Sequence, residues 1–192
     1  CQEVDAEDID EERVRAAKVT YLEGYLWDPP APIRACTRAM EIAKAAGRTV
    51  AMTLSDVFCV EGHREDFLRL LAGPVDLVFA NENEAKALFR TDDTDTAIAE
   101  MARAARLAVI TRSEKGAVVV KGDARHAVPA QKVARVLDTT GAGDLFAAGF
   151  LVGFTRGRPL AECAIMGTIA AAEVIEHYGA RPESDLKARV AA

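Results

Sequence analysis

The stretch DTTGAGD, residues 138–144, is followed at once by an apolar run from Leu145 to Phe154. Two glycines flank an alanine just before this run, which predicts a tight turn that opens a buried helix. The N–H groups at a helix N-terminus are unpaired and lie at the positive end of the helix dipole, so they favour anions. Asp144 lies where the helix should begin, and a carboxylate there can accept a proton from an alcohol. The stretch predicts a phosphoryl-transfer site, although a plain turn with an aspartate cap also fits these seven residues.

The composition describes a globular chain that has enough residues for one compact domain. Half of its 192 residues are hydrophobic, and its formal net charge is -6. No basic stripe stands out, which argues against nucleic acid as a partner. No apolar run is long enough to span a membrane, so we expect no membrane partner either. We expect the acidic cluster from Glu3 to Glu12 to be a solvated helix start or a loop.

The cysteines predict a reducing compartment. None of the four forms a C-x-x-C pair, and Cys36, Cys59 and Cys163 lie among apolar residues. Buried free thiols explain this pattern better than disulfides do. We therefore expect a cytoplasmic protein. The three histidines show no metal-binding spacing, and we expect them to be ordinary surface or core residues.

Alternating strand and helix patterns predict an α/β fold with a parallel-rich central sheet and helices on both faces. A β-hairpin follows this alternating part, at 117–121 and 125–128, with Gly122-Asp123 as its turn. Two largely apolar helices, 144–156 and 160–177, close the chain. The expected strands are 19–22, 49–54, 75–80 and 107–111, and the expected earlier helices are 31–46, 63–71, 83–89 and 95–106.

Polar residues follow two of these strands where the strands end. Asn81-Glu82-Asn83-Glu84 follows the strand 75–80, and TRSEKG, residues 111–116, follows the strand 107–111. Ligands of such folds bind at the carboxyl ends of the strands. Alone, the first motif is better explained as a helix cap and the second as a polar loop. Together with the DTTGAGD stretch, they predict one ligand site.

These motifs resemble those of the ribokinase family, the PfkB-type carbohydrate kinases. Residues 138–150, DTTGAGDLFAAGF, match the C-terminal signature of that family throughout. Asn81 to Glu84 is similar to its N-x-x-E motif, Thr111 to Gly116 to its T-x-x-x-x-G nucleotide loop, and Gly179-Ala180-Arg181-Pro182 to its closing G-A-x-P segment. Within the family, the stretches YLEGY (21–25), TLSD (53–56) and FANE (79–82) look most like bacterial adenosine kinase-type members.

The resemblance implies transfer of the γ-phosphoryl group of ATP to the hydroxymethyl alcohol of a nucleoside or sugar, with adenosine as the first expectation. Asp144 would be the general base. The loop Gly141-Ala142-Gly143, through the N–H groups of Ala142, Gly143 and Asp144, would stabilise the charge on the transferring oxygens. Glycine there lets phosphate approach the backbone closely.

The resemblance also implies the cofactors. Mg²⁺ would bridge phosphate oxygens and be held through water by Glu84 and Asn81. Asp138 and Thr140 would help to hold K⁺. Ile165 and Ile169 would pack near the adenine. The nucleotide would be bound by Asn81, Thr111, Ser113, Gly116 and Gly143.

One departure from the family limits these expectations. Family members carry an N-terminal portion with the first part of the sheet, a substrate motif and a β-strand lid, and the sequence lacks a match to them. We expect residues 1–192 to be the C-terminal, nucleotide-binding portion of a ribokinase-like domain, inactive by itself, whose complete form is a possible homodimer. A sugar kinase of ribokinase or fructokinase type and a nucleotide-binding module without catalysis are the alternatives. A Rossmann dehydrogenase is disfavoured because no G-x-G-x-x-G follows the first strand.

Overall fold

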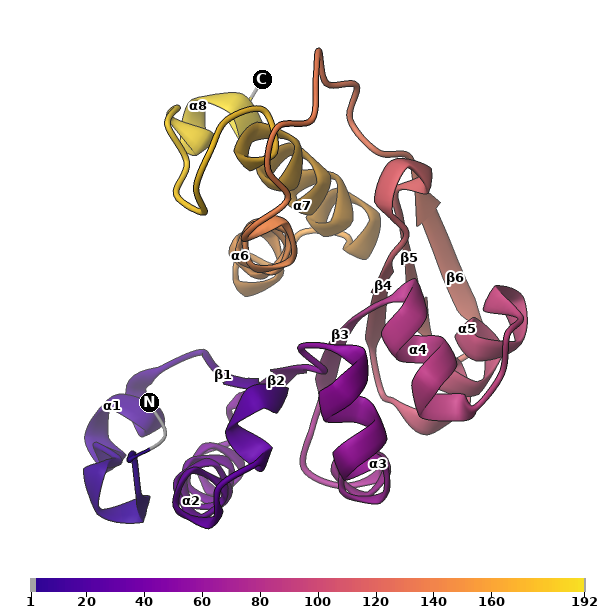
Figure 1. The fold of residues 1–192 in the computed structure, drawn as a ribbon. Coiled ribbons are helices and arrows are strands. Elements are labelled where there is room, and N and C mark those ends of the chain that lie inside the picture. Colours follow the sequence, from indigo (N-terminus) through magenta and orange to yellow (C-terminus); the bar gives the residue numbers. More distant parts are fainter. Residues whose placement is uncertain (1–2, 192) are drawn as a thin grey trace. The chain divides into compact units, whose positions relative to one another are not determined.

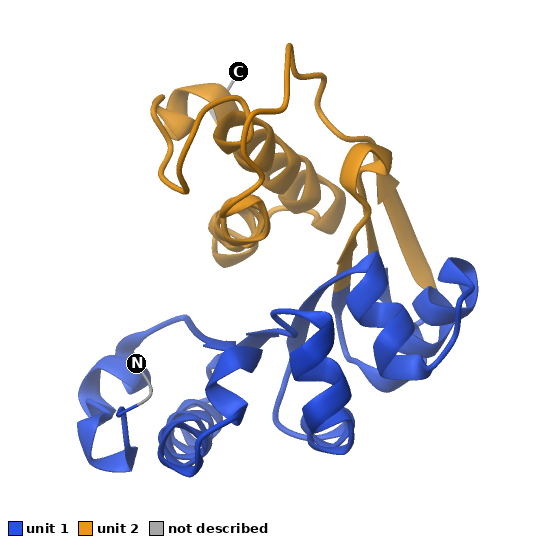
Figure 2. Ribbon diagram, in the orientation of Figure 1, with its two compact units in different colours: residues 1–108, 120–123 blue, residues 109–119, 124–192 orange. Residues whose placement is uncertain are grey.

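The computed structural model describes residues 3–191, and the chain divides into two compact units (Figure 2). The first unit comprises residues 1–108 and 120–123, and the second comprises residues 109–119 and 124–192. The strands are hydrogen-bonded in the order β1-β2-β3-β4-β5-β6. Their bounds are β1 Val19–Glu23, β2 Thr49–Thr53, β3 Leu77–Asn81, β4 Ala108–Thr111, β5 Ala117–Lys121 and β6 Ala124–Val128.

The α-helices of the first unit are α1 Glu11–Ala16, α2 Pro30–Ala45, α3 Val57–Ala72, α4 Glu82–Phe89 and α5 Thr94–Ala104. Those of the second unit are α6 Ala142–Thr155, α7 Leu160–Val174 and α8 Leu186–Ala191. Short 3₁₀ turns lie at Ala6–Asp8, Gly24–Trp27 and Ser113–Lys115.

In the first unit, β1, β2 and β3 are parallel neighbours, with Val19 opposite Thr49 and Ala51 opposite Leu77. Each strand is joined to the next by one helix, α2 or α3. Right-handed crossovers between sequential neighbours place their helices on the same face of a sheet. Figure 1 shows α2 and α3 on one side of these strands. The carboxyl ends of β2 and β3 therefore lead directly into the N-termini of α3 and α4.

The core of the first unit is formed by strands that are apolar on both faces. Val50 and Met52 of β2 and Leu77 and Val78 of β3 are fully buried. Such near-continuous apolar strands are typical of a parallel sheet that helices cover. Burial of each of these side chains stabilises the fold by about 1.5–3 kcal/mol before the loss of conformational entropy is counted.

Asp76, just before β3, ties three elements of this unit together. Its carboxylate accepts Lys44 Nζ of α2 at 2.6 Å, an Arg106 nitrogen at 3.0 Å and the N–H of Val50 at 2.9 Å. The Asp76 side chain is 22% exposed, so these charged contacts are partly shielded from water. This carboxylate fixes where α2 lies against the sheet.

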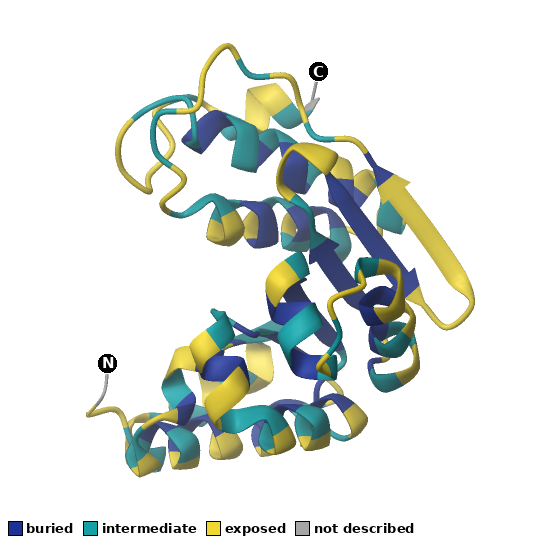
Figure 3. Ribbon diagram, turned by 45° about the vertical axis from the view of Figure 1, so that its right-hand side comes forward, coloured by how far each residue is buried: buried dark blue, intermediate teal, exposed yellow. Residues whose placement is uncertain are grey.

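In the second unit, α6 and α7 pack closely because glycines form their contact. A Cβ on Gly149 would lie 2.6 Å from Met166 O, and one on Gly167 would lie 2.9 Å from Phe146 O. Gly153 lies in the same contact, where a Cβ would lie 2.8 Å from Met166 Sδ. Helix α7 also packs against β6. Figure 3 shows the contrast between the buried strands β4 and β5 and the exposed β6.

The expected strands and the hairpin are confirmed, with Gly122 at φ +55° in the turn. Two helix starts were predicted too late. Helix α3 begins at Val57 and departs from helical geometry at His63, so the pattern from His63 detected only its second half. Helix α6 begins at Ala142 rather than Asp144. The end of α7 was predicted too late, because the helix stops at Val174 rather than His177.

The acidic N-terminal cluster forms capped helix starts, as expected: Asp5 caps the turn Ala6–Asp8 and Asp10 caps α1. Cys36, Cys59 and Cys163 are buried free thiols, which confirms that expectation for the described cysteines. Across residues 3–191, every helix is too short or too polar to cross a lipid bilayer.

Candidate functional site

The two glycines of the DTTGAGD stretch differ in backbone conformation and in the space around them. Gly141 precedes α6 at φ +79°, and a Cβ there would lie 2.7 Å from the Cβ of Ala180. The fold itself therefore requires glycine at 141. Gly143 lies in the first turn of α6, and a Cβ there would meet no other atom within 4 Å. Neither packing nor backbone conformation explains glycine at 143, whereas a ligand close to the backbone would.

The unpaired N–H groups at the start of α6 belong to Gly143 and Asp144. The Ala142 N–H donates to Thr139 O at 3.1 Å, so the expectation that it faces a ligand is wrong. Among the described residues, the N–H groups of Gly143 and Asp144 have no acceptor, and no side chain caps the helix. Both residues are exposed. Two donors at the positive end of the dipole thus remain for an anion, next to the Asp144 carboxylate.

Asp138 holds this loop by accepting hydrogen bonds from the side chain and backbone of Thr140 and from the backbone of Gly179. Its Oδ1 accepts the N–H of Thr140 and its Oδ2 accepts the N–H of Gly179, both at 2.9 Å. These hydrogen bonds, those from Thr140 first, lower the pKa of Asp138 to about 2. The carboxylate is ionised at neutral pH and joins the loop that precedes α6 to the loop that follows α7.

A second carboxylate, Glu173 near the end of α7, holds the same closing segment. It is 3% exposed and accepts the N–H groups of Glu183 and Ser184 at 2.9 and 2.8 Å. Burial alone would raise the pKa of Glu173, but the hydrogen bonds from Ser184 and Glu183 outweigh it and lower the pKa. His177 lies 3.5 Å from Glu173. The G-A-x-P segment is therefore fixed at both of its ends.

Asn81 and Glu84 form a capping box at the start of α4. The Asn81 side chain accepts the N–H of Glu84, and the Glu84 carboxylate accepts the N–H of Asn81, each at 2.9 Å. The motif therefore forms a helix cap, as one of its two explanations predicted. Glu84 is 4% exposed, and burial raises its pKa to about 7 despite the hydrogen bonds from Asn81. A buried carboxyl with a strongly raised pKa at a strand end is a candidate for a functional site.

The sequence motifs did not single out Asp56, which lies at the equivalent end of β2. It caps α3 by accepting the N–H of Cys59 at 2.7 Å, which lowers its pKa, and it bonds the Tyr25 hydroxyl. Its negative charge contributes to the raised pKa of Glu84. The signal in the sequence was an aspartate three residues after the end of a buried strand. Asp56 and Glu84 together give the first unit two carboxylates that could hold a cation.

The T-x-x-x-x-G loop, Thr111 to Gly116, closes on itself through its backbone. Gly116 N–H donates to Ser113 O, and Arg112 N–H donates to Gly116 O. Gly116 has φ +85°, and a Cβ there would lie 2.0 Å from Val128 O, so glycine is structural here. Ser113 has φ +50° in the same tight loop.

The expected site residues are divided between the two units. Asn81 and Glu84, with Asp56, belong to the first unit, and the other expected site residues belong to the second. On α7, Ile165 is 41% exposed and Ile169 is half-buried, one turn apart. In residues 3–191, no three His, Cys, Asp or Glu side chains are grouped so as to bind a metal on their own. A cation here would take part of its coordination from water or from phosphate.

Comparisons with known proteins identify the family and the fold of the chain. Residues 2–187 match the model of the pfkB family carbohydrate kinases. A cytidine kinase of Thermococcus kodakarensis is 44% identical over 119 residues, which are 60% of this chain and 42% of that protein. The crystal structure of an adenosine kinase from Sinorhizobium meliloti is 52% identical and has a TM-score of 0.97. The match covers 100% of this chain and 60% of that one.

A more distant structure, a putative ribokinase II from E. coli in complex with ATP and Mg²⁺, is 19% identical with a TM-score of 0.86. The match covers 98% of this chain and 62% of that one, and it shows the fold alone. The chain thus spans between two fifths and two thirds of the length of these proteins. The expected ribokinase-like α/β fold is confirmed.

Proposed function

The chain belongs to the pfkB family of carbohydrate kinases, and from this membership we propose that it is the ATP- and Mg²⁺-binding part of a kinase that phosphorylates a nucleoside, with adenosine as the first candidate. The kinase class follows from the family. The nucleoside is favoured because an adenosine kinase and a cytidine kinase are among the relatives. A sugar acceptor is the second candidate, since the family as a whole is named for carbohydrates.

The observation that carries the proposal is the start of α6. Gly143 is a glycine that the fold does not require, its N–H and that of Asp144 have no acceptor among the described residues, and an exposed carboxylate follows. Two N–H groups aimed at one place stabilise charge on transferring phosphoryl oxygens. The Asp144 carboxylate is the group available there to accept the proton of the acceptor alcohol as its oxygen bonds to phosphorus.

The carboxylates of the first unit fit the chemistry of Mg²⁺. This ion prefers oxygen ligands, keeps several waters and bridges phosphate oxygens when bound. Glu84 and Asp56 supply two carboxylates at adjacent strand ends, and a bound cation would favour the ionised form of Glu84. Mg²⁺ would neutralise charge on the β- and γ-phosphates. We propose K⁺ near Asp138 and Thr140 as well, and this rests on the family resemblance alone.

The test is phosphoryl transfer by the full-length protein, measured with Mg²⁺–ATP and a panel of adenosine, cytidine, ribose and fructose. Asp144→Asn should lower kcat by about 10²- to 10⁴-fold, the range for loss of a general base, and leave ATP binding nearly unchanged. Glu162→Gln is the matched control, because Glu162 is also an acidic residue in the first turn of a helix. A kcat of Asp144→Asn within threefold of the parent would refute its assignment as base.

We also propose that residues 1–192 alone transfer phosphate poorly. Without the rest of a kinase, nothing holds the alcohol near the γ-phosphate, and the advantage of positioned reactants is lost. The measurement is AMP formation from adenosine by the isolated chain. Turnover near 1 per second, the low end of ordinary enzyme rates, would contradict this expectation.

A further inference from the structure

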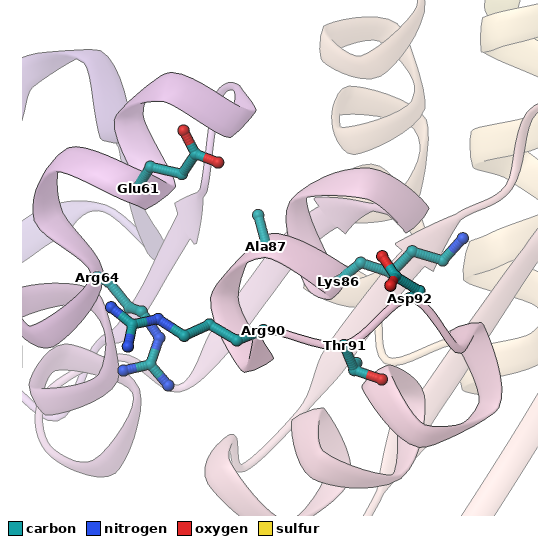
Figure 4. A pocket seen from close by; sticks show the side chains of 7 residues that line it. All are labelled: Glu61, Arg64, Lys86, Ala87, Arg90, Thr91 and Asp92. Atoms are coloured by element: carbon teal, nitrogen blue, oxygen red, sulfur yellow. The ribbon is translucent and has the colours of Figure 1, made fainter.

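A pocket of about 430 Å³ lies between α3 and α4 in the first unit. It is lined by Glu61, Arg64, Lys86, Ala87, Arg90, Thr91 and Asp92 (Figure 4). Its volume falls in the range of small-molecule sites, which is about 300–1,000 Å³. It belongs neither to the glycine loop of α6 nor to the capping box at Asn81. Its residues are not among those that the proposed kinase chemistry uses.

Two guanidinium groups converge in this pocket. Figure 4 shows the side chains of Arg64, from α3, and Arg90, after α4, pointing toward one another. Arg64 Nε donates to Leu88 O at 2.6 Å, which fixes its plane and leaves its two terminal nitrogens for another acceptor. Within residues 3–191, neither arginine forms an ion pair with a carboxylate. Glu61, one turn before Arg64, extends away from both.

The backbone at Arg90 makes this arrangement more specific. Arg90 ends α4 in the left-handed conformation, at φ +52° and ψ +49°, and its N–H bonds to Ala87 O and Lys86 O. Glycine is the usual residue at such a helix end, because a side chain there is strained. The chain places a long cationic side chain where glycine would be more stable. An anion between the two guanidinium groups would offset the repulsion between their like charges.

We propose that this pocket is a second anion site, which binds the phosphate group of a small phosphorylated metabolite between Arg64 and Arg90. Guanidinium groups bind phosphate oxygens in pairs of parallel hydrogen bonds, and two of them match a dianion. The far part of the pocket offers Lys86, Asp92 and the Thr91 hydroxyl, which suit the hydroxyl groups of a sugar-like remainder. This site and Glu84 lie at opposite ends of helix α4, because Asn81 caps the N-terminus of the helix and Arg90 caps its C-terminus.

The experiment uses the full-length protein and inorganic phosphate as the probe. The ¹⁵N side-chain resonances of Arg64 and Arg90 should shift on titration with phosphate but not with sodium chloride at equal ionic strength. In Arg90→Gly, phosphate affinity read at the remaining Arg64 resonance should fall about tenfold or more, the scale of one lost charge-assisted hydrogen bond. The melting temperature of this variant should hold or rise, because glycine relieves the backbone strain.

Two further variants separate this site from others. Arg64→Lys keeps the charge but loses the paired geometry and should also weaken phosphate binding. Arg69→Gln, on the same helix but already paired with Asp66, is the matched control and should bind phosphate like the parent. Unmoved resonances of Arg64 and Arg90, or an Arg90→Gly affinity within twofold of the parent, would overturn the proposal. None of these measurements depends on phosphoryl transfer. The anion-site proposal is therefore tested independently of the kinase proposal.

Discussion

Asp138 accepts the N–H of Gly179 at 2.9 Å across 41 residues of sequence, so one carboxylate ties the segment before α6 to the segment after α7. Its other oxygen binds the N–H of Thr140. The start of α6, with its two open N–H groups, is positioned by this link. The position of the proposed phosphate donors therefore depends on a charge that does not itself need to touch phosphate.

We predict that Asp138→Leu loosens the segment around Gly179. Amide exchange at Thr140 and Gly179 should become faster, because both N–H groups lose their acceptor. The same loss should occur in the parent protein at low pH. The folded pKa is about 2, below the unfolded value of 3.8, so this contribution is present above about pH 4 and is lost as the pH falls toward 2. Asp123→Leu, in the exposed hairpin turn, is the control, and equal exchange at Thr140 in parent and Asp138→Leu would contradict the prediction.

The glycine pair predicts opposite effects for two identical substitutions. Gly143→Ala should leave the fold intact or stabilise it by about 0.5–1 kcal/mol, because alanine favours a helix and has room there. It should lower kcat by about 10²-fold, the scale of a lost oxyanion donor, since the Cβ keeps phosphate from the N–H. Gly141→Ala should destabilise the fold by about 1–3 kcal/mol through its left-handed backbone and the contact with Ala180. Urea unfolding and kcat distinguish these effects, and an active Gly143→Ala enzyme would remove the evidence for a phosphate at this loop.

We predict that the stabilisation of the protein by Mg²⁺ depends on pH through Glu84. Its folded pKa of about 7 lies above the ordinary 4.5, so without metal the free energy of unfolding should fall as the pH rises between these values. Mg²⁺ needs the ionised carboxylate, so the rise in melting temperature that Mg²⁺ causes should be larger at about pH 8 than at about pH 6.

Glu84→Gln should flatten both trends in thermal melts. It should also lower stability, because the capping box at Asn81 is weakened. Glu61→Gln, an exposed acid on α3, is the control. A magnesium effect independent of pH in the parent protein would exclude Glu84 from the cation site.

Asp76 predicts the largest stability loss among the surface-facing acids of the first unit. Asp76→Asn removes the charge that Lys44 and Arg106 bind, and should lower the free energy of unfolding by about 1–3 kcal/mol. Asp66→Asn is the matched control, because that carboxylate pairs with Arg69 on one exposed helix and should change stability by less than about 0.5 kcal/mol. Denaturant midpoints measure both, and similar losses in the two variants would contradict a special role for Asp76.

The order of the elements was predictable because it depends on local patterns. Apolar runs such as 75–80 and the turn at Gly122 mark strands and hairpins through periodicity and backbone conformation alone. The start of α3 was missed because the helix departs from helical geometry at His63, which interrupts the periodic pattern between buried Cys59 and Val60 and buried Phe67 and Leu71. What marks that start is the Asp56 cap.

The site was predictable where a motif is contiguous and not where distant residues meet. The DTTGAGD stretch pointed to Gly143 and Asp144 because a helix start is a local feature. It did not reveal that Asp138 binds the N–H of Gly179, 41 residues along the chain. Arg64 and Arg90, which line one pocket, are also far apart in the sequence, as are Asp56 and Glu84, whose pKa Asp56 helps to raise. Such contacts depend on how the chain packs, which periodicity does not describe.

The sequential order β1-β2-β3 has a consequence for how the first unit forms during synthesis. Each strand pairs with the one made just before it, and one helix separates them. The β1-β2 pair is therefore complete once Thr53 has emerged from the ribosome, and β3 adds to an edge that already exists. The partners Val19 and Thr49 are 30 residues apart, so their pairing closes a shorter loop than a pairing between the two ends of the chain would. This half of the protein can be assembled strand by strand as the chain emerges, without waiting for residues made last.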